Sequence, residues 1–390
     1  MFNKRIIAYI LFFSVLLCNI CVNTNKETYA AAEIDISSKS AILMEASTGK
    51  IIYEKNPDEK MPPASITKIM TLLLIFEAID KGELSLDEMV TTSEEAAKMG
   101  GSNVYLEAGE QLSVDDMIKC ISISSANDAA YAMGERLGGT IDNFVVMMND
   151  KAKELGMNNT HFVNCHGLDA KDHYSTARDI AIMSGELISK YPQITKYSTT
   201  WMDSIIHKTK RGEQKFDLSN TNKLVRTYEG ITGLKTGSTA DAGYCLSATA
   251  KRNDIDLIAV VMNSKDHKSR FSECKQLLDY GFSKCCMYRD DLRDKYFEID
   301  VSKGKKDKVY GKVEKEFKKL YIEEKNFDKI RYEIMFNEDI TAPVKYGEEL
   351  GEVIYYDDDK EIGRLTVYAD SEVEKAGFFH CLKTFARFFF

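Results

Sequence analysis

Residues 62–75 read Pro-Pro-Ala-Ser-Ile-Thr-Lys-Ile-Met-Thr-Leu-Leu-Leu-Ile, a proline pair followed by an apolar run. The pattern predicts a helix from about Ala64 to Gly82, with Ser65 in its first turn. Residues three apart share a helix face, so we expect Lys68 beside Ser65. The positive end of the helix also favours a developing negative charge in this turn. The stretch therefore predicts a serine hydroxyl with a lysine amine next to it.

The segments around this helix predict a mixed α/β domain. A hairpin pattern precedes it, a block of helices follows, and a second hairpin and a last helix close the region. Because strands lie at both ends of the helical block, we expect one antiparallel sheet flanked by helices. The predicted elements are strands 40–47 and 50–54, helices 114–122, 143–155 and 177–189 with one more ending at 138–139, strands 244–250 and 255–262, and helix 268–281.

The character of the sequence changes again near residue 291. Short alternating segments separated by charged turns predict a small all-β domain. The predicted strands are 296–301, 308–313, 319–323, 330–336, 352–356 and 364–368. We therefore divide the chain into residues 33–290, residues 291–370 and two terminal segments.

The N-terminal segment, residues 1–32, has the layout of a secretory signal peptide. Lys4 and Arg5 precede the apolar run 6–22, and alanines follow at positions 30–32. An uncleaved anchor helix is the alternative. Either interpretation predicts export, with the protein outside the cytoplasm, at the outer face of the membrane or beyond it.

The C-terminal segment, residues 371–390, predicts an amphipathic helix. Its aromatic and aliphatic side chains fall on one helical face, and basic and polar side chains fall on the other. The run is too short to span a bilayer but could lie in the interface, so we expect contact with the membrane surface from about Val373 onward. The alternative is a helix packed on the β-domain.

Charge and cysteine content exclude other classes. The net charge of −9 argues against a nucleic-acid partner, because no excess of Lys and Arg is available to displace counterions. Seven of the nine cysteines lie beyond residue 32 without regular spacing. We interpret them as buried thiols, not as a disulfide framework or a zinc site.

Three short motifs occur in a characteristic order. The pattern S-x-x-K is found four times, but only at Ser65-Ile66-Thr67-Lys68 does it open a strong helix. Ser125-Ala126-Asn127 is the one S-x-N and Lys235-Thr236-Gly237 the one K-T-G. Together they are the known mark of penicillin-binding proteins and β-lactamases. The set predicts acyl transfer through a serine.

With these motifs the chain resembles a low-molecular-mass penicillin-binding protein of the D-alanyl-D-alanine carboxypeptidase type. The resemblance covers roughly residues 35–285 strongly and the β-rich region more loosely. It implies a β-lactamase/transpeptidase-like fold and no cofactor or metal. Further stretches that carry it are residues 62–64, 128–130, 166–168, 173–179, 220–222 and 233–234.

The resemblance also implies roles for the motif residues. Ser65 would attack the penultimate D-alanine of a peptidoglycan stem peptide ending in D-Ala-D-Ala, and β-lactam antibiotics would acylate it as inhibitors. Lys68 would be the general base, its pKa lowered by burial and by Lys235. Ser125 would relay the proton to the leaving amine.

Substrate-binding roles follow in the same way. Asn127 would hold the substrate amide, while Lys235 and Thr236 would bind the terminal carboxylate. The resemblance assigns three more residues to substrate binding. Gly237 would leave room where a side chain would intrude on the substrate. The backbone N–H of Ser238 would join that of Ser65 in an oxyanion hole, and Arg270 would be a second cation for the carboxylate.

Rival interpretations remain. His161, His166 and His173 could suggest a metal, but their spacing is not that of zinc peptidases, and we interpret them as structural. Glu154 opens an E-x-x-x-N stretch that superficially resembles an element of one β-lactamase class. From another class, the chain could be a catalytically inactive cell-wall-binding protein.

Overall fold

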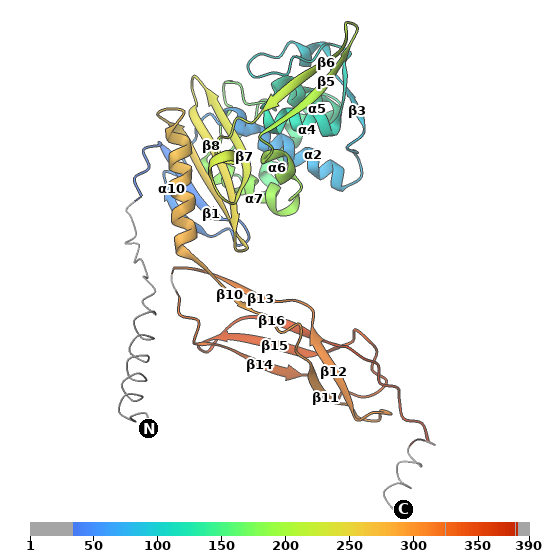
Figure 1. The fold of residues 1–390 in the computed structure, drawn as a ribbon. Coiled ribbons are helices and arrows are strands. Elements are labelled where there is room, and N and C mark those ends of the chain that lie inside the picture. Colours follow the sequence, from blue (N-terminus) through green and yellow to red (C-terminus); the bar gives the residue numbers. More distant parts are fainter. Residues whose placement is uncertain (1–33, 324, 379, 381–390) are drawn as a thin grey trace, which may run out of the picture. The chain divides into compact units, whose positions relative to one another are not determined.

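The structure is a computed structural model that describes residues 34–323, 325–378 and 380. The predicted signal peptide lies outside these residues. The first domain contains a five-stranded antiparallel sheet in the order β2-β1-β9-β8-β7 (Figure 1). Its strands are β1 (Ser40–Glu45), β2 (Ile51–Lys55), β7 (Ile231–Thr239), β8 (Gly243–Arg252) and β9 (Ile255–Ser264). The sheet combines strands from both ends of the domain, as predicted.

Helices cover both faces of this sheet. Residues alternate between the faces of a strand, so Leu43 and Met44 point to opposite sides. A Cβ on Gly281 of α10 (Ser269–Lys284) would meet Leu43 and Leu257, whereas one on Gly185 of α7 (Ala177–Lys190) would meet Met44 and Ile258. The helix α10 therefore covers one face and α7 the other.

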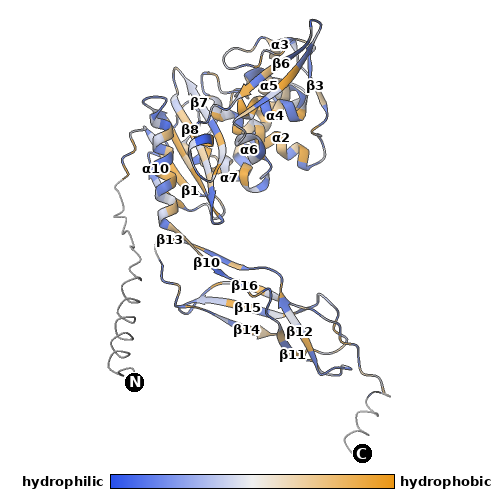
Figure 2. Cartoon of the chain, viewed as in Figure 1, coloured by the Kyte–Doolittle hydropathy of each residue, from blue (hydrophilic) through white to orange (hydrophobic). Residues whose placement is uncertain are grey.

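The helical block surrounds α2 (Lys68–Asp80), which follows the short 3-10 turn η1 (Ala64–Thr67). Ten of the 13 residues of α2 are buried, which agrees with its largely apolar sequence (Figure 2). The other helices are α3 (Glu94–Ala97), α4 (Val114–Ile123), α5 (Asn127–Gly138), α6 (Ile141–Glu154), α8 (Ile194–Ser198) and α9 (Leu224–Thr227). Ser113 caps the start of α4, because its Oγ accepts from the Asp116 N–H at 3.1 Å.

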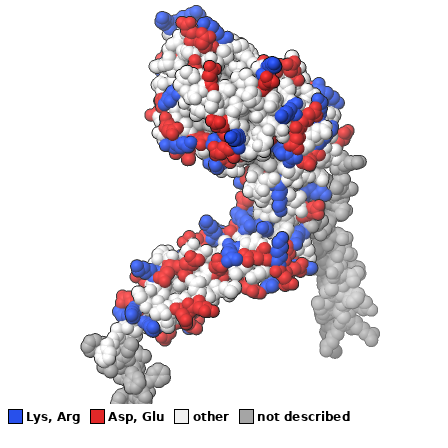
Figure 3. All heavy atoms as spheres, turned by 180° about the vertical axis from the view of Figure 1, so that it is seen from behind, with Lys and Arg blue, Asp and Glu red and all other residues white. Residues whose placement is uncertain are grey.

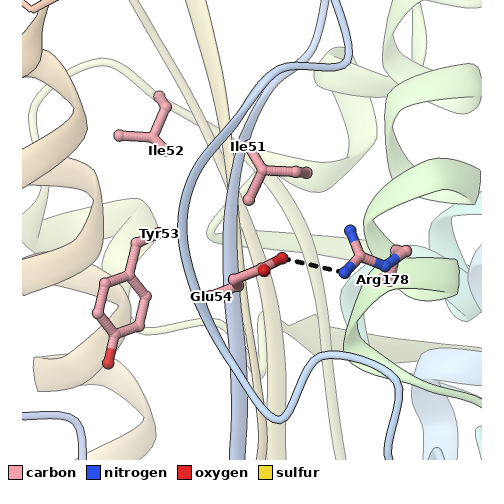
Figure 4. A pocket seen from close by; sticks show the side chains of 5 residues that line it. All are labelled: Ile51, Ile52, Tyr53, Glu54 and Arg178. Carbon is pink, nitrogen blue, oxygen red and sulfur yellow. Dashed lines mark hydrogen bonds and ion pairs between the residues drawn. The ribbon is translucent and has the colours of Figure 1, made fainter.

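Two small two-stranded antiparallel sheets in the first domain were not predicted. One pairs β3 (Met89–Thr91) with β4 (Gln111–Ser113), and the other pairs β5 (Met202–Thr209) with β6 (Gly212–Ser219). At the β2 edge of the main sheet, residues 51–54 line a shallow hollow with Arg178, which pairs with Glu54 at 3.0 Å (Figure 4). This hollow lies at the opposite sheet edge from β7 and the K-T-G motif.

The second domain is all-β, as predicted. Its main sheet has the order β11-β12-β16-β15-β14, and a separate antiparallel pair joins β10 to β13. The strands are β10 (Cys285–Asp290), β11 (Phe297–Asp300), β12 (Lys308–Val313), β13 (Phe317–Ile322), β14 (Ile330–Phe336), β15 (Glu349–Asp357) and β16 (Lys360–Ala369). Its apolar core includes Val309, Val353 and Val367. The strand β10 was not predicted.

The C-terminal segment differs from the prediction at its start. Val373 forms a β-bridge with Val344 and Lys375 one with Gly304, so the backbone there is extended and not helical. Val373 is buried, because its side chain completes the apolar core of the second domain. The rest of the predicted helix, at residue 379 and residues 381–390, lies outside the described residues. No helix in the described part of the chain is long and apolar enough to cross a membrane.

Candidate active site

The predicted serine–lysine pair is in contact. Lys68 Nζ lies 2.9 Å from Ser65 Oγ. Ser65 stands in η1 and not in the α-helix, which begins at Lys68, four residues later than the predicted start at Ala64. Ala64 has a positive φ of 49°, a conformation that is uncommon outside glycine and is found at constrained sites. The nucleophile therefore sits on a tight turn at the positive end of α2.

The other partners of Lys68 fix the direction of its amine. Nζ is 2.6 Å from Asn127 Oδ1 and 2.7 Å from the His166 carbonyl oxygen. Both oxygens can only accept hydrogen bonds, so each takes one N–H of Lys68. A neutral amine has two N–H groups and one lone pair. In the neutral form the lone pair must therefore point at the Ser65 hydroxyl, which is where a general base needs it.

The orientation of Asn127 is set by its own neighbours. Its Nδ2 donates to the Gly100 carbonyl at 2.7 Å, so Oδ1 is the atom that faces Lys68. A Cβ on Gly101 would lie 2.7 Å from Asn127 Nδ2, so the adjacent loop packs closely on this amide. One N–H and one lone pair of the amide remain for a ligand.

Burial makes the neutral form of Lys68 accessible. The side chain is fully buried, and this desolvation lowers its pKa to about 7. Electrostatic interactions with Cys165 and Asp128 act in the opposite direction. The predicted lowering by burial is confirmed. Lys235, which was predicted to contribute, is not among the causes of this shift. The pKa of Lys235 itself is lowered, by burial first and by Lys68 second.

The strand β7 brings the K-T-G motif to the nucleophile. A Cβ on Gly237 would lie 3.0 Å from the Pro63 carbonyl oxygen and 3.1 Å from Ala64 Cβ. A glycine is therefore needed here because β7 packs directly on η1. The sequence predicted another reason, namely that a side chain here would intrude on the substrate. In the structure the space that the first side-chain atom would fill is occupied by this turn. The close approach places Ser238 next to the Ser65 turn.

Lys235 and Thr236 each donate one side-chain hydrogen bond within the described structure. Lys235 is almost fully buried, and Nζ donates to the Thr236 carbonyl at 3.2 Å. The Thr236 hydroxyl donates to Thr221 Oγ1 at 2.6 Å. Asn222 Nδ2 bonds the Gly233 carbonyl at 3.0 Å, so residues 220–222 hold the start of β7. Thr221 was not predicted as a site residue.

Arg270 supports the same strand from α10. Its Nη1 donates to the Gly237 carbonyl at 3.0 Å and to the Cys245 carbonyl at 3.4 Å, while the guanidinium stacks on Tyr244 and Phe271. Its Nε is buried without a partner among the described residues. Arg270 thus lies next to the motif, as predicted, with hydrogen-bonding capacity left over.

Ser125 is the least engaged member of the predicted set. It is buried, with a left-handed φ of 63°, and precedes α5 by two residues. Strained backbone of this kind clusters at functional sites. Within the described structure its hydroxyl makes no hydrogen bond to Ser65 or Lys68, although Asn127 contacts Lys68 directly.

The backbone of His166 and Gly167 completes the site and was not predicted. Gly167 has a φ of 91°, and a Cβ there would lie 1.9 Å from the Ala64 carbonyl oxygen. The His166 carbonyl is an acceptor for Lys68. The sequence flagged His166-Gly167-Leu168 only through the family resemblance. A backbone carbonyl leaves no side-chain signature, so motif spacing could not identify it.

The three predicted structural histidines are bound to neighbouring groups. His173 Nδ1 accepts from the Val163 N–H at 3.0 Å, so Nε2 donates to Thr67 Oγ1 at 2.9 Å. His166 Nδ1 accepts from the Leu168 N–H at 3.2 Å. His161 Nδ1 lies 2.7 Å from the Asp172 carbonyl oxygen. Burial lowers the pKa of His166 to about 3 and that of His173 to about 4, so both are neutral near pH 7.

The cysteines of the described chain form no disulfide. Cys120, Cys165, Cys245, Cys274 and Cys285 are buried free thiols, and Cys286 is half-buried. Burial raises the pKa of Cys165 to about 12, so the thiol nearest to Lys68 is protonated at neutral pH. Burial also raises the pKa of Cys120, Cys245, Cys274 and Cys285, which is opposite to the shift that activates a reactive cysteine.

A Ser–Lys pair at a helix start, a neighbouring asparagine and a K-T-G strand define the class of serine enzymes that contains penicillin-binding proteins and β-lactamases. Comparison with known proteins narrows this class. Residues 25–266 match the family described as D-alanyl-D-alanine carboxypeptidase, and residues 293–375 match the C-terminal domain of penicillin-binding protein 5. The chain belongs to the D-alanyl-D-alanine carboxypeptidase family of serine peptidases.

Individual relatives agree over most of the chain. D-alanyl-D-alanine carboxypeptidase DacF of Bacillus subtilis is 41% identical and covers 90% of each chain. Penicillin-binding protein 5 of Haemophilus influenzae is 30% identical, with a TM-score of 0.65 over 87% of this chain and 98% of its own. Penicillin-binding protein D2 of Listeria monocytogenes, solved in an ampicillin-bound form, is 34% identical, with a TM-score of 0.56 over 63% of this chain and 98% of its own.

Proposed function

We propose that this protein is a serine D-alanyl-D-alanine carboxypeptidase that removes the terminal D-alanine from peptidoglycan stem peptides. The observation that carries the proposal is the hydrogen bonding of Lys68. Asn127 and His166 occupy both N–H groups of the neutral amine, so its lone pair faces the Ser65 hydroxyl. The family and its carboxypeptidase relatives support the choice of substrate.

The chemistry proceeds in two steps. Lys68 takes the Ser65 proton as Oγ bonds to the carbonyl carbon of the penultimate D-alanine. The oxyanion is stabilised by the backbone N–H groups of Ser65 and Ser238. The peptide C–N bond then breaks, and the proton passes from Lys68 through Ser125 to the leaving amine of D-alanine. Water hydrolyses the resulting ester, which releases the shortened peptide and restores Ser65.

Substrate contacts use the capacity that the protein leaves open. Asn127 retains one N–H and one lone pair for the substrate amide. Charged Lys235 has two further N–H groups and Arg270 an unbonded Nε, and these groups receive the terminal carboxylate. The Thr236 hydroxyl joins them by turning its proton from Thr221 Oγ1 to the carboxylate. The arriving carboxylate favours the charged form of Lys235 and so opposes the effect of burial on its pKa.

A β-lactamase would need a carboxylate that activates the deacylating water. Glu154 does not meet this need, because it ends α6, is 59% exposed and pairs with Lys151 at 2.7 Å. Asp128 is buried in the same domain, but it accepts hydrogen bonds from the N–H groups of Val104, Leu106 and Ala129. These positions favour a long-lived penicillin adduct over rapid penicillin hydrolysis.

The test is the release of D-alanine from a stem peptide ending in D-Ala-D-Ala. Wild type should release one D-alanine per peptide, and prior treatment with penicillin should abolish the release. A matched peptide that ends in a single D-alanine is the control and should not be cleaved. Rapid turnover of penicillin, with no release of D-alanine, would instead support a β-lactamase.

We also propose that the protein acts outside the cytoplasm, at the membrane surface. The signal-like residues 1–32 and the aromatic, basic pattern of residues 378–390 support this location. Phe378, at the start of that pattern, is 77% exposed. The tail that contacts lipid begins after Ala376, since Val373 and Lys375 form β-bridges with the β-domain and the Ala376 N–H donates to the Lys303 carbonyl at 2.8 Å.

Truncation after Gly377 should release the protein from anionic liposomes, while hydrolysis of a soluble peptide persists. This cut keeps the Val373 and Lys375 bridges, so the β-domain stays intact. Co-sedimentation of the full and truncated proteins with vesicles measures the effect. Equal partitioning of both forms would reject the membrane contact and favour a tail that packs on the protein.

A further inference from the structure

Residues 164–168 form a loop that one side chain holds together. Asn164 Oδ1 accepts from the His166 N–H at 3.2 Å and from the Gly167 N–H at 2.6 Å. Its Nδ2 donates to the Leu168 carbonyl at 3.0 Å. Three consecutive residues are therefore fixed by a single half-buried amide.

This loop touches the catalytic pair at two points. The His166 carbonyl accepts from Lys68 Nζ at 2.7 Å. Gly167 packs so closely on the turn of the nucleophile that a Cβ would lie 2.9 Å from the Ser65 backbone nitrogen. A displacement of the loop would therefore change both the amine of Lys68 and the backbone of Ser65.

We propose that Asn164 is a positioning residue for the acylation step: it holds the His166 carbonyl against Lys68 Nζ and so keeps the amine lone pair directed at Ser65. Without this acceptor, the N–H that it binds is free to rotate toward Ser65 in place of the lone pair. The proposal rests on the proposed function, because it assigns a role within that reaction.

The loop also keeps water from Lys68. Desolvation is the main cause of its lowered pKa, and Cys165 and Asp128 act against it. The other titratable groups coupled to Lys68 are His166 and Lys235, whose own pKa values it lowers. A loosened loop admits water without removing any of these groups. The pKa of Lys68 should then move back toward its ordinary value.

Asn149 provides a matched control. It is also a half-buried asparagine that bonds the backbone of the same segment, with Oδ1 accepting from the Phe162 N–H at 2.9 Å and Nδ2 donating to the Phe162 carbonyl at 2.8 Å. None of its hydrogen bonds reaches His166 or Gly167. The variant Asn149→Ala should therefore loosen the fold comparably but leave the site in place.

The experiment compares wild type, Asn164→Ala, Asn164→Asp and Asn149→Ala in two measurements. The first is the rate of acylation by a fluorescent penicillin across pH. The second is the titration of Lys68 by NMR with ¹³C-labelled lysine, its signal assigned by its loss in Lys68→Ala. The aspartate keeps the oxygen that accepts from His166 and Gly167, so it should retain more activity than the alanine.

We expect Asn164→Ala to acylate about 10–100-fold more slowly at neutral pH, the size typical of a misplaced reacting group. Its Lys68 titration should shift upward, so that part of the rate returns at higher pH. Asn149→Ala should change neither. The proposal is overturned if Asn164→Ala keeps the wild-type rate and Lys68 titration, or if both alanine variants lose the same activity with unchanged pH profiles. A shifted Lys68 titration with no acylation of wild type would instead reject the proposed function and retain the positioning role.

Discussion

Two lysines of the first domain and the surface lysines of the second domain lie in opposite environments. In the first domain Lys68 and Lys235 are buried, and no carboxylate of the described chain lies within hydrogen-bonding distance of either amine. In the second domain Lys308 is 49% exposed and pairs with Glu298 at 2.6 Å. Figure 3 shows such basic and acidic side chains interspersed on the surface of the β-rich region.

The pKa values follow these environments. Burial lowers the pKa of Lys68 to about 7, whereas the hydrogen bond to Glu298 raises the pKa of Lys308. A surface pair contributes little to stability. A buried amine without an anion destabilises the folded state, so its presence indicates a functional site. In our proposal the buried Lys68 serves as a neutral base, and the buried Lys235 gains its anion when the substrate carboxylate arrives.

The largest effect is expected from Lys68→Ala. Removal of the general base should slow penicillin acylation by ~10² to 10⁴-fold, with the fold retained. Lys308→Ala is the control from the other domain and should acylate at the wild-type rate. Stopped-flow fluorescence with a labelled penicillin measures both rates, and circular dichroism checks the folding of each variant. Near-wild-type acylation by Lys68→Ala would assign the base to another group.

The pH dependence of acylation tests whether the pKa of Lys68 is lowered. Only neutral Lys68 can take the Ser65 proton, and its folded pKa is about 7. The rate should therefore fall about tenfold for each pH unit below this value and level off above it. Acylation rates between pH 5 and 9, with a folding control at each pH, give the profile. A rate that rises only near the ordinary pKa of lysine would show that Lys68 is not desolvated in solution.

A smaller, selective effect is expected from Lys235→Ala. The loss of one charge-assisted hydrogen bond, about 1.5–3 kcal/mol, should weaken substrates with a free terminal carboxylate by roughly 10–100-fold. A neutral ester analogue should lose much less. Steady-state kinetics on the acid and the ester make the comparison. Equal losses on both substrates would move Lys235 from carboxylate binding to the chemical step.

Much of this architecture can be predicted from the sequence. The helices at 143–155 and 177–189 and the hairpin at 244–262 were predicted to within a few residues, because their apolar periodicity and flanking turns are strong. The two-stranded sheets β3–β4 and β5–β6 were not predicted. In β6 only Leu218 is buried, so its sequence lacks the alternation that marks a half-buried strand.

The site shows the same division. Ser65, Lys68 and Asn127 were predicted from motifs, and in the structure Lys68 contacts both of the others. The His166 carbonyl and the close packing of Gly167 on Ala64 were not predicted, because they depend on backbone atoms brought together by tertiary structure. The close packing of Gly237 on η1 was not predicted either, since only the fold shows that this turn lies against it.

The most direct test of the central claim is mass spectrometry of the intact protein after incubation with penicillin, beside Ser65→Ala. We expect one long-lived adduct per wild-type chain, which peptide digestion maps to Ser65. The Ser65→Ala variant should carry no adduct. The same adduct on Ser65→Ala, or its assignment to the S-x-x-K serines Ser47, Ser272 or Ser302, would contradict the claim that the Lys68 lone pair activates Ser65.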